Sequence, residues 1–170
     1  KRLMQVWNQG YLAELPYPHH VQPQLAPSWL VALQTALGQR ASSLLSGFRY
    51  CELGCGQGLN SLLLAASNPA GQFVAVDFNP RHIEQGRRLA AAAQLRNIEF
   101  VQADFTELLA QPGEGYDFIV AHGVYSWVAP AQRAAIRGFV EQRLNANGLL
   151  CLGYMCQPGM APLAAAQRFI

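Results

Sequence analysis

The sequence predicts an α/β fold built on a doubly wound parallel sheet. From Phe48 onward, short apolar runs alternate with segments rich in helix-forming residues, which is the pattern of strand-helix-strand units. The first run leads into a glycine-rich turn, and the first three runs each carry an acidic residue at or near their ends. Because the carboxyl ends of parallel strands share one edge of a sheet, these features predict a ligand site at that edge.

Length and composition narrow the class of protein. The chain has 170 residues, enough for one domain with a substantial core. Its composition is 51% hydrophobic and 13% charged, which argues against disorder. A net charge of +2 argues against a nucleic-acid partner. No apolar run reaches the roughly eighteen residues that a membrane span requires, so no membrane association is expected.

The cysteines predict a cytoplasmic protein without a bound metal. None of them has the spacing of a zinc site, and we expect all of them to be reduced, small apolar residues. They are Cys51, Cys55, Cys151 and Cys156.

We expect residues 1–47 to form an arm and a helix, and residues 48–170 to form the ligand-binding core. The segment Tyr11–Pro27 is rich in proline, which excludes a regular helix or a central strand. This stiff segment, which includes Tyr17, could fold over a ligand as a lid, or it could be a plain surface arm. The helix that follows places one set of apolar residues on a single face. These are Trp29, Leu30, Leu33, Ala36 and Leu37.

The glycine-rich turn lies between a predicted strand, Phe48–Leu53, and a predicted helix, Leu59–Ala66. Glycine accepts positive φ and lets a ligand approach the backbone, and the helix that follows presents unpaired N–H groups. The spacing is Gly-x-Gly-x-Gly, with Glu52 two positions before it, whereas a dinucleotide fingerprint has Gly-x-Gly-x-x-Gly. A carboxylate at this place would repel a pyrophosphate. The motif therefore favours S-adenosylmethionine, which is cationic and has no phosphate, although it also fits a tight turn without a ligand.

The second and third predicted strands also end in acids. Gln72–Asp77 places Asp77 about twenty residues beyond the turn, where a carboxylate can bind ribose hydroxyls. Asn79 is the better candidate to cap the helix that runs to about residue 95. Ile98–Asp104 ends in Asp104, which with Phe105 could bind the adenine amino group and pack against its ring. The alternative for Asp104 is an ordinary cap of the next helix.

Two more strands complete the predicted sheet. Tyr116–Ala121 is the fourth, and a helix opens at Pro130 and ends at Asn147-Gly148. Leu149–Met155 is the fifth.

From Phe48 to Met155 the chain resembles the class I S-adenosylmethionine-dependent methyltransferases. Tyr11–Pro18 and His122–Val128 are similar to a bacterial group whose methyltransferase domain is followed by a methyltransferase regulatory domain, and some members of which act on protein lysines. The resemblance implies a Rossmann-like methyltransferase fold that lacks its final antiparallel edge strands here, as expected for part of a longer protein. It also implies a set of cofactor-binding residues. These are Tyr17, Glu52, Gly54, Cys55, Gly56, Asn60, Asp77, Phe78, Asp104, Phe105 and His122.

Methyl transfer from a sulfonium needs alignment and exclusion of water rather than a catalytic triad. The loop after the fourth strand carries His122, Tyr125 and Trp127. We expect His122 and Tyr125 to be the catalytic residues, with His122 supporting the methionine end of the cofactor. Tyr125 and Trp127 would shape the acceptor slot, or alternatively pack at the strand-helix junction. The acceptor, a protein side chain or a small molecule, stays open.

Two other functions remain possible from the sequence alone. An NAD-dependent oxidoreductase fits Asp77 but not the glycine spacing or Glu52. A non-catalytic module that binds S-adenosylmethionine and signals through a partner fits all of the motifs.

Overall fold

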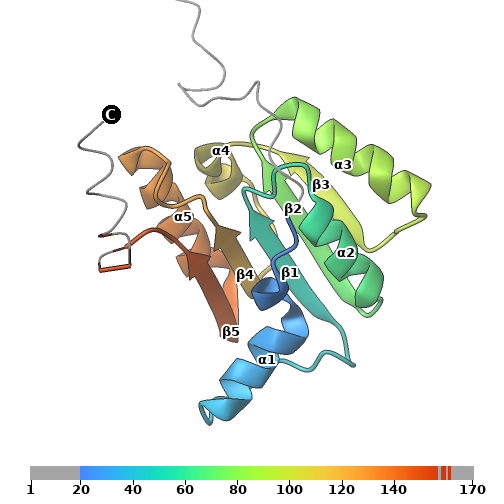
Figure 1. The fold of residues 1–170 in the computed structure, drawn as a ribbon, viewed down its shortest axis with the longest axis vertical. Helices are drawn as coiled ribbons and strands as arrows, with labels where there is room; N and C mark the ends of the chain where they lie inside the picture. The colour runs from blue at the N-terminus through green and yellow to red at the C-terminus, as the bar shows by residue number, and fades with distance from the viewer. Residues whose placement is uncertain (1–19, 157, 160, 162–170) are drawn as a thin grey trace, which may run out of the picture.

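A single parallel sheet organises the structure, a computed structural model that describes residues 20–156, 158, 159 and 161. Within these residues the sheet has the strand order β3-β2-β1-β4-β5, and every pair of neighbours is parallel (Figure 1). The chain moves outward from β1 in both directions, which confirms the doubly wound fold class. The strands are β1 (Phe48–Leu53), β2 (Gly71–Asp77), β3 (Ile98–Gln102), β4 (Tyr116–His122) and β5 (Leu144–Gly153).

Helices cover both faces of the sheet. A short 3-10 helix, η1 (Pro23–Leu25), leads into the first of three helices on one face, and two helices lie on the other (Figure 1). The first face carries α1 (Pro27–Ala36), α2 (Leu59–Ser67) and α3 (Pro80–Ala92), and the second carries α4 (Phe105–Ala110) and α5 (Pro130–Arg143). No helix in the described ranges has the length and apolar character to cross a membrane.

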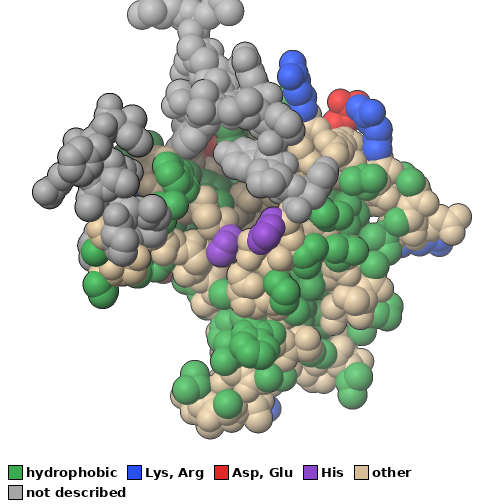
Figure 2. All heavy atoms as spheres, viewed as in Figure 1, with side chains coloured by type: hydrophobic (Ala, Val, Ile, Leu, Met, Phe, Trp, Pro, Cys, Tyr) green, Lys and Arg blue, Asp and Glu red, His purple; other side chains and the backbone are tan. Residues whose placement is uncertain are grey.

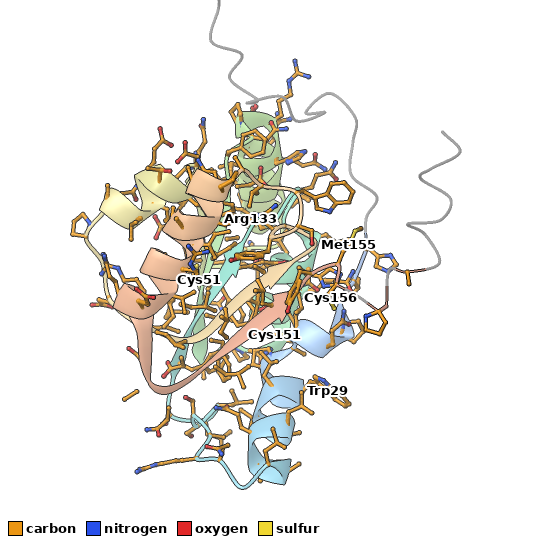
Figure 3. All side chains as sticks on the ribbon, turned by 90° about the vertical axis from the view of Figure 1, so that its left-hand side faces the viewer. Trp29, Cys51, Arg133, Cys151, Met155 and Cys156 are labelled. Carbon is orange, nitrogen blue, oxygen red and sulfur yellow. The ribbon has the colours of Figure 1, made fainter. Side chains whose placement is uncertain are left out.

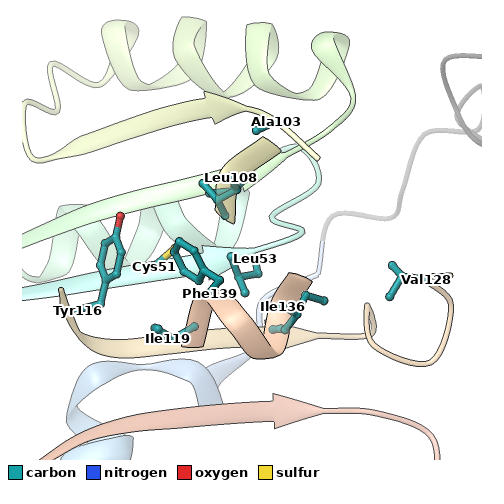
Figure 4. Close-up of a cluster of buried hydrophobic side chains, with 11 residues drawn as sticks. Cys51, Leu53, Ala103, Leu108, Tyr116, Ile119, Val128, Ile136 and Phe139 are labelled. Carbon is teal, nitrogen blue, oxygen red and sulfur yellow. The ribbon is translucent and has the colours of Figure 1, made fainter. Parts of the chain in front are cut away.

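The central strands are buried on both faces, and their side chains alternate between two core layers. Tyr50 of β1 packs in an aromatic cluster under α1 and α2, together with Phe48, Phe73 and Phe118. Cys51 and its neighbours in the other layer pack against α4 and α5 (Figure 4). The members of this second layer that Figure 4 labels on β1, α4 and α5 are Cys51, Leu53, Leu108, Ile136 and Phe139.

The fifth strand begins earlier than the sequence predicts. The helix that opens at Pro130 ends at Arg143 rather than at Asn147-Gly148, and β5 starts at Leu144. Asn147 has a φ of 64°, and the pairing of β4 with β5 shifts its register between Tyr116 and Phe118. The turn residues therefore form an irregularity inside the strand rather than a connection before it.

The predicted apolar face of α1 is only partly buried. Leu30 is 1% exposed, whereas Trp29 is 53% exposed and projects from the helix (Figure 3). Leu33 and Leu37 are also exposed, and Figure 2 shows hydrophobic side chains gathered over this part of the surface. The stripe that meets the sheet is instead the one containing Leu30 and Gln34, whose Nε2 donates to Asn147 O at 3.2 Å.

Gly58→Ala is expected to destabilise the fold. Gly58 has a φ of +76°, and a Cβ at this position would overlap the ring of Phe100. Backbone strain and overpacking together predict a loss of about 3 kcal/mol in the free energy of unfolding, measured by chemical denaturation. Gly38→Ala is the control, because Gly38 has a φ of +68° with nothing within 4 Å, and strain alone predicts about 1 kcal/mol. Equal losses for the two variants would contradict the role given to Phe100.

Candidate functional site

The predicted site residues that the structure describes lie at or near the carboxyl edge of the sheet. β1 lies between β2 and β4. After β1 the chain adds strands on one side of it, β2 and then β3, and afterwards returns to add β4 and β5 on the other side. The switch point of the sheet is therefore the place between β1 and β4. Ligands of doubly wound sheets bind outside the carboxyl ends of the strands at such a switch point. The glycine turn follows β1 here, and the loop with His122 and Tyr125 follows β4.

The glycine turn is held by the end of β2. The amides of Gly54 and Cys55 both donate to Val76 O, at 2.8 and 2.9 Å. Gly54 has a φ of +74°, and a Cβ there would overlap Val124 of the loop after β4. Gly56 also has positive φ, +56°, but a Cβ there would meet nothing within 4 Å. Gly56 is therefore the point of the turn where a ligand can come close to the backbone.

Glu52 is a buried carboxylate beneath the turn. The residue is only 6% exposed, and Ser61 Oγ donates a hydrogen bond to Glu52 Oε2. The pKa of Glu52 is raised to about 7, chiefly by burial and in smaller part by the charge of Asp77, while the Ser61 hydroxyl and the nearby Asn60 side chain limit the rise. Asn60 is itself buried, and its Oδ1 accepts a hydrogen bond from Gln22 N at 3.1 Å. Asn60 thus links the segment before η1 to the start of α2.

Asp77 joins the glycine turn to the end of β2. Its Oδ2 accepts a hydrogen bond from Gly56 N at 2.9 Å, and its Oδ1 accepts one from Asn79 N at 2.8 Å. His82 Nδ1 lies 3.3 Å from the same Oδ1. As predicted, Asn79 caps α3, because its side chain accepts from Arg81 N. Phe78, between Asp77 and the cap, is half-buried.

Asp104 is the N-cap of α4, as its alternative interpretation proposes. Its Oδ1 accepts from the amides of Thr106 and Glu107, and the Glu107 side chain accepts in return from Asp104 N, which completes a capping box. Phe105 is partly buried and packs against the core layer that α5 covers. Its amide donates to Gln132 Oε1 at 3.0 Å. Because Asp104 is half-buried rather than enclosed, a capping role does not prevent it from meeting a ligand.

His122 is the last residue of β4 and is exposed. It pairs in register with Gly153 of β5, and Gly123 N donates to Gly153 O at 3.0 Å. A Cβ at Gly153 would overlap the imidazole of His122. Gly153 has no side chain, and this leaves room for the imidazole of His122 at the edge of the sheet.

Tyr125 is held by α5. Arg137 Nη1 donates to the Tyr125 hydroxyl at 3.1 Å, and the guanidinium of Arg133 lies over the ring at 5.8 Å. The ring of Tyr154, after β5, meets Tyr125 edge-on at 6.1 Å. Trp127 is 59% exposed, so it is not the packing residue of the strand-helix junction that its alternative interpretation describes.

The segment after β5 also fastens this loop. Met155 N donates to Ser126 Oγ at 2.8 Å, while Arg133 donates to Ser126 O and Val128 O. Arg133 and Met155 both lie at this end of the sheet (Figure 3). The loop after β4 is thus tied to α5 on one side and to the end of β5 on the other.

Sequence reasoning missed several residues of the site. His82, Val124 and Gly153 contact predicted site residues, but no spacing rule connects them to those residues. Tyr17 lies outside the described residues. In the part of the chain that the structure describes, no three His, Cys, Asp or Glu side chains are grouped so that they could hold a metal ion.

Known proteins are similar to this chain in both sequence and fold. A family model described as a methyltransferase domain matches residues 44–168. An uncharacterised protein of Synechocystis is 39% identical over 164 residues, which cover 96% of this chain and 32% of that protein. Trans-aconitate 2-methyltransferase of Paracidovorax citrulli is 35% identical over 101 residues, covering 59% of this chain and 36% of that enzyme.

The fold comparison agrees. The structure of PKMT2 from Rickettsia typhi in complex with AdoHcy matches with a TM-score of 0.83 and 28% identity, covering 91% of this chain and 29% of that one. This chain therefore spans about a third of the length of each of these relatives. With its glycine turn and parallel sheet, the chain belongs to the methyltransferase-domain family, within the class I S-adenosylmethionine-dependent methyltransferases.

Proposed function

We propose that this domain binds S-adenosylmethionine across the carboxyl ends of β1, β2 and β3, and that the protein transfers its methyl group to an acceptor at the loop after β4. One observation carries the proposal: Gly56 faces open space while its amide is bonded to the buried carboxylate of Asp77. This leaves a ligand room to approach the backbone beside two buried acids, Glu52 and Asp77.

Each acid has a distinct partner in this proposal. Asp77 binds the ribose hydroxyls, and Asp104 with Phe105 receives the adenine. Glu52 supplies negative charge beneath the turn, which favours a cationic ligand. The cofactor itself supplies an activated methyl group, so the protein has only to align it with the acceptor and exclude water. His122 and Tyr125 stand where the acceptor would meet the methyl group.

The proposed acceptor is a protein side chain. Trp127, Tyr154 and Met155 are exposed apolar residues close to Tyr125 and Ser126, and a patch of this kind marks a surface for a macromolecular partner. The resemblance to a group that includes protein methyltransferases also supports this choice. A screen with labelled cofactor in which only small molecules accept the methyl group would refute it.

We also propose that the protein works in the cytoplasm. All four cysteines are free, and Cys51 is buried in the core, a pattern that suits a reducing compartment. Recovery of the native protein in an extracytoplasmic fraction would overturn this proposal.

The direct test of cofactor binding is calorimetry with S-adenosylhomocysteine. Asp77→Ala should weaken binding by about 10- to 100-fold, because a charged hydrogen-bond acceptor for the ribose is lost. Glu84→Gln, an exposed change on α3, should leave the affinity unchanged. A folded wild-type protein that binds NADH but not S-adenosylhomocysteine would restore the oxidoreductase hypothesis, while tight binding without turnover on any acceptor would favour the non-catalytic module.

Affinity for S-adenosylmethionine should rise with pH. The pKa of Glu52 is about 7, so its ionised fraction grows between pH 6 and 8, and a cationic ligand binds the ionised form better. We expect an increase of up to about tenfold across this range, measured by calorimetry. Glu52→Gln should bind more weakly and show a flatter profile.

The pH dependence of stability in the ligand-free protein gives an independent check of the raised pKa of Glu52. The pKa of Glu52 is higher in the folded state than its ordinary 4.5, so the folded state holds more protons between these values. The free energy of unfolding should therefore fall as pH rises from about 4.5 to 7. Glu52→Gln should remove this part of the fall, and an unchanged profile would argue against a protonated Glu52.

Trp127→Ala should lower kcat/KM for a protein acceptor by roughly tenfold, because exposed aromatic residues dominate binding at protein interfaces. Affinity for S-adenosylhomocysteine should not change. Leu37→Ala, at an exposed apolar position just after α1, is the matched control. A loss of cofactor affinity in Trp127→Ala would place this side chain in the cofactor site instead.

A further inference from the structure

We infer that His82 is a positioning residue that fixes the plane of the Asp77 carboxylate for binding ribose. The inference rests on the role proposed above for Asp77 and extends it to a side chain in the first turn of α3. Both residues are only 7% exposed, so water competes little for the contact between them.

The cap of α3 determines which nitrogen of His82 carries the proton. Asn79 Oδ1 accepts from Arg81 N at 3.0 Å, which fixes the orientation of the Asn79 amide. Its Nδ2 then faces His82 Nε2 at 3.4 Å. An amide NH₂ only donates, so Nε2 must accept, and the single proton of the neutral imidazole lies on Nδ1. His82 Nδ1 therefore donates to Asp77 Oδ1, at 3.3 Å.

The His82 donor fixes the plane of the Asp77 carboxylate, which the backbone donors alone do not. Gly56 N and Asn79 N hold one oxygen each of the Asp77 carboxylate. The terminal torsion of an aspartate is broad, so two such contacts leave the carboxylate plane able to rock. A third donor, from the His82 side chain to Oδ1, restricts that motion. Oδ2, which accepts from Gly56 N at the open point of the turn, is then aimed at the ligand.

The experiment compares two substitutions at His82. His82→Asn keeps an N–H close to the place of Nδ1, whereas His82→Leu removes the donor and keeps much of the volume. Binding of S-adenosylhomocysteine and of an analogue without ribose hydroxyls is measured by calorimetry for each variant. Loss of one hydrogen bond to a charged group predicts that His82→Leu binds S-adenosylhomocysteine about tenfold more weakly. Its affinity for the analogue should stay within about twofold of wild type, and His82→Asn should resemble wild type with both ligands.

Two results would overturn the inference. One is that His82→Leu, folded like wild type, binds both ligands equally more weakly, or binds both as well as wild type does. The other is a nitrogen NMR spectrum of the wild-type protein showing His82 protonated on Nε2 instead of Nδ1. The NMR measurement needs no variant, so it decides the matter even if His82→Leu does not fold. Failure of the wild type to bind S-adenosylhomocysteine is a separate outcome, which removes the proposed function and this inference together.

Discussion

The site depends on the junction between the glycine turn and the end of β2. Two amides of the turn bond to Val76 O, and the amide of Gly56 bonds to the Asp77 carboxylate. The backbone of one strand and the side chain that ends it thus hold the turn in its positive-φ conformation. Because the turn is fixed, Gly54 offers a flat surface on which Val124 of the loop after β4 packs. The end of β2, the glycine turn and the loop after β4 therefore meet at one point of the structure.

The second feature of this part of the structure is the pair of buried acids. Two acids, Glu52 and Asp77, are buried close enough that the charge of Asp77 raises the pKa of Glu52. Burying an acid is unfavourable unless hydrogen bonds or opposite charge compensate. Asp77 has its compensation in several donors, while burial raises the pKa of Glu52, which has Ser61 as its hydrogen-bond donor. A nearby positive charge would favour the ionised form of Glu52.

Local patterns were enough to predict the fold class, and the place of two acids at the carboxyl edge of the sheet. Glu52 and Asp77 lie where strand-like runs end, and the geometry of a parallel sheet brings such ends together. The sequence could not reveal the exposed side of α1, because the contact that orients this helix joins Gln34 to Asn147, far along the chain. The same holds for His82 and Gly153, whose roles depend on tertiary contacts rather than on spacing. Asn147-Gly148 misled the prediction because a turn signal does not distinguish a bulge from a connection.

The irregular start of β5 affects chemistry at the other end of the strand. Tyr116 pairs with Leu144 and Phe118 with Leu149, so five steps along β5 match two along β4. Beyond this offset the ladder runs regularly until His122 faces Gly153. Deleting or adding a single residue in the offset would slide the strand and bring a larger neighbour beside the imidazole. An insertion or deletion at residues 145–148, in the middle of β5, would therefore change the packing of His122 where the same strand ends.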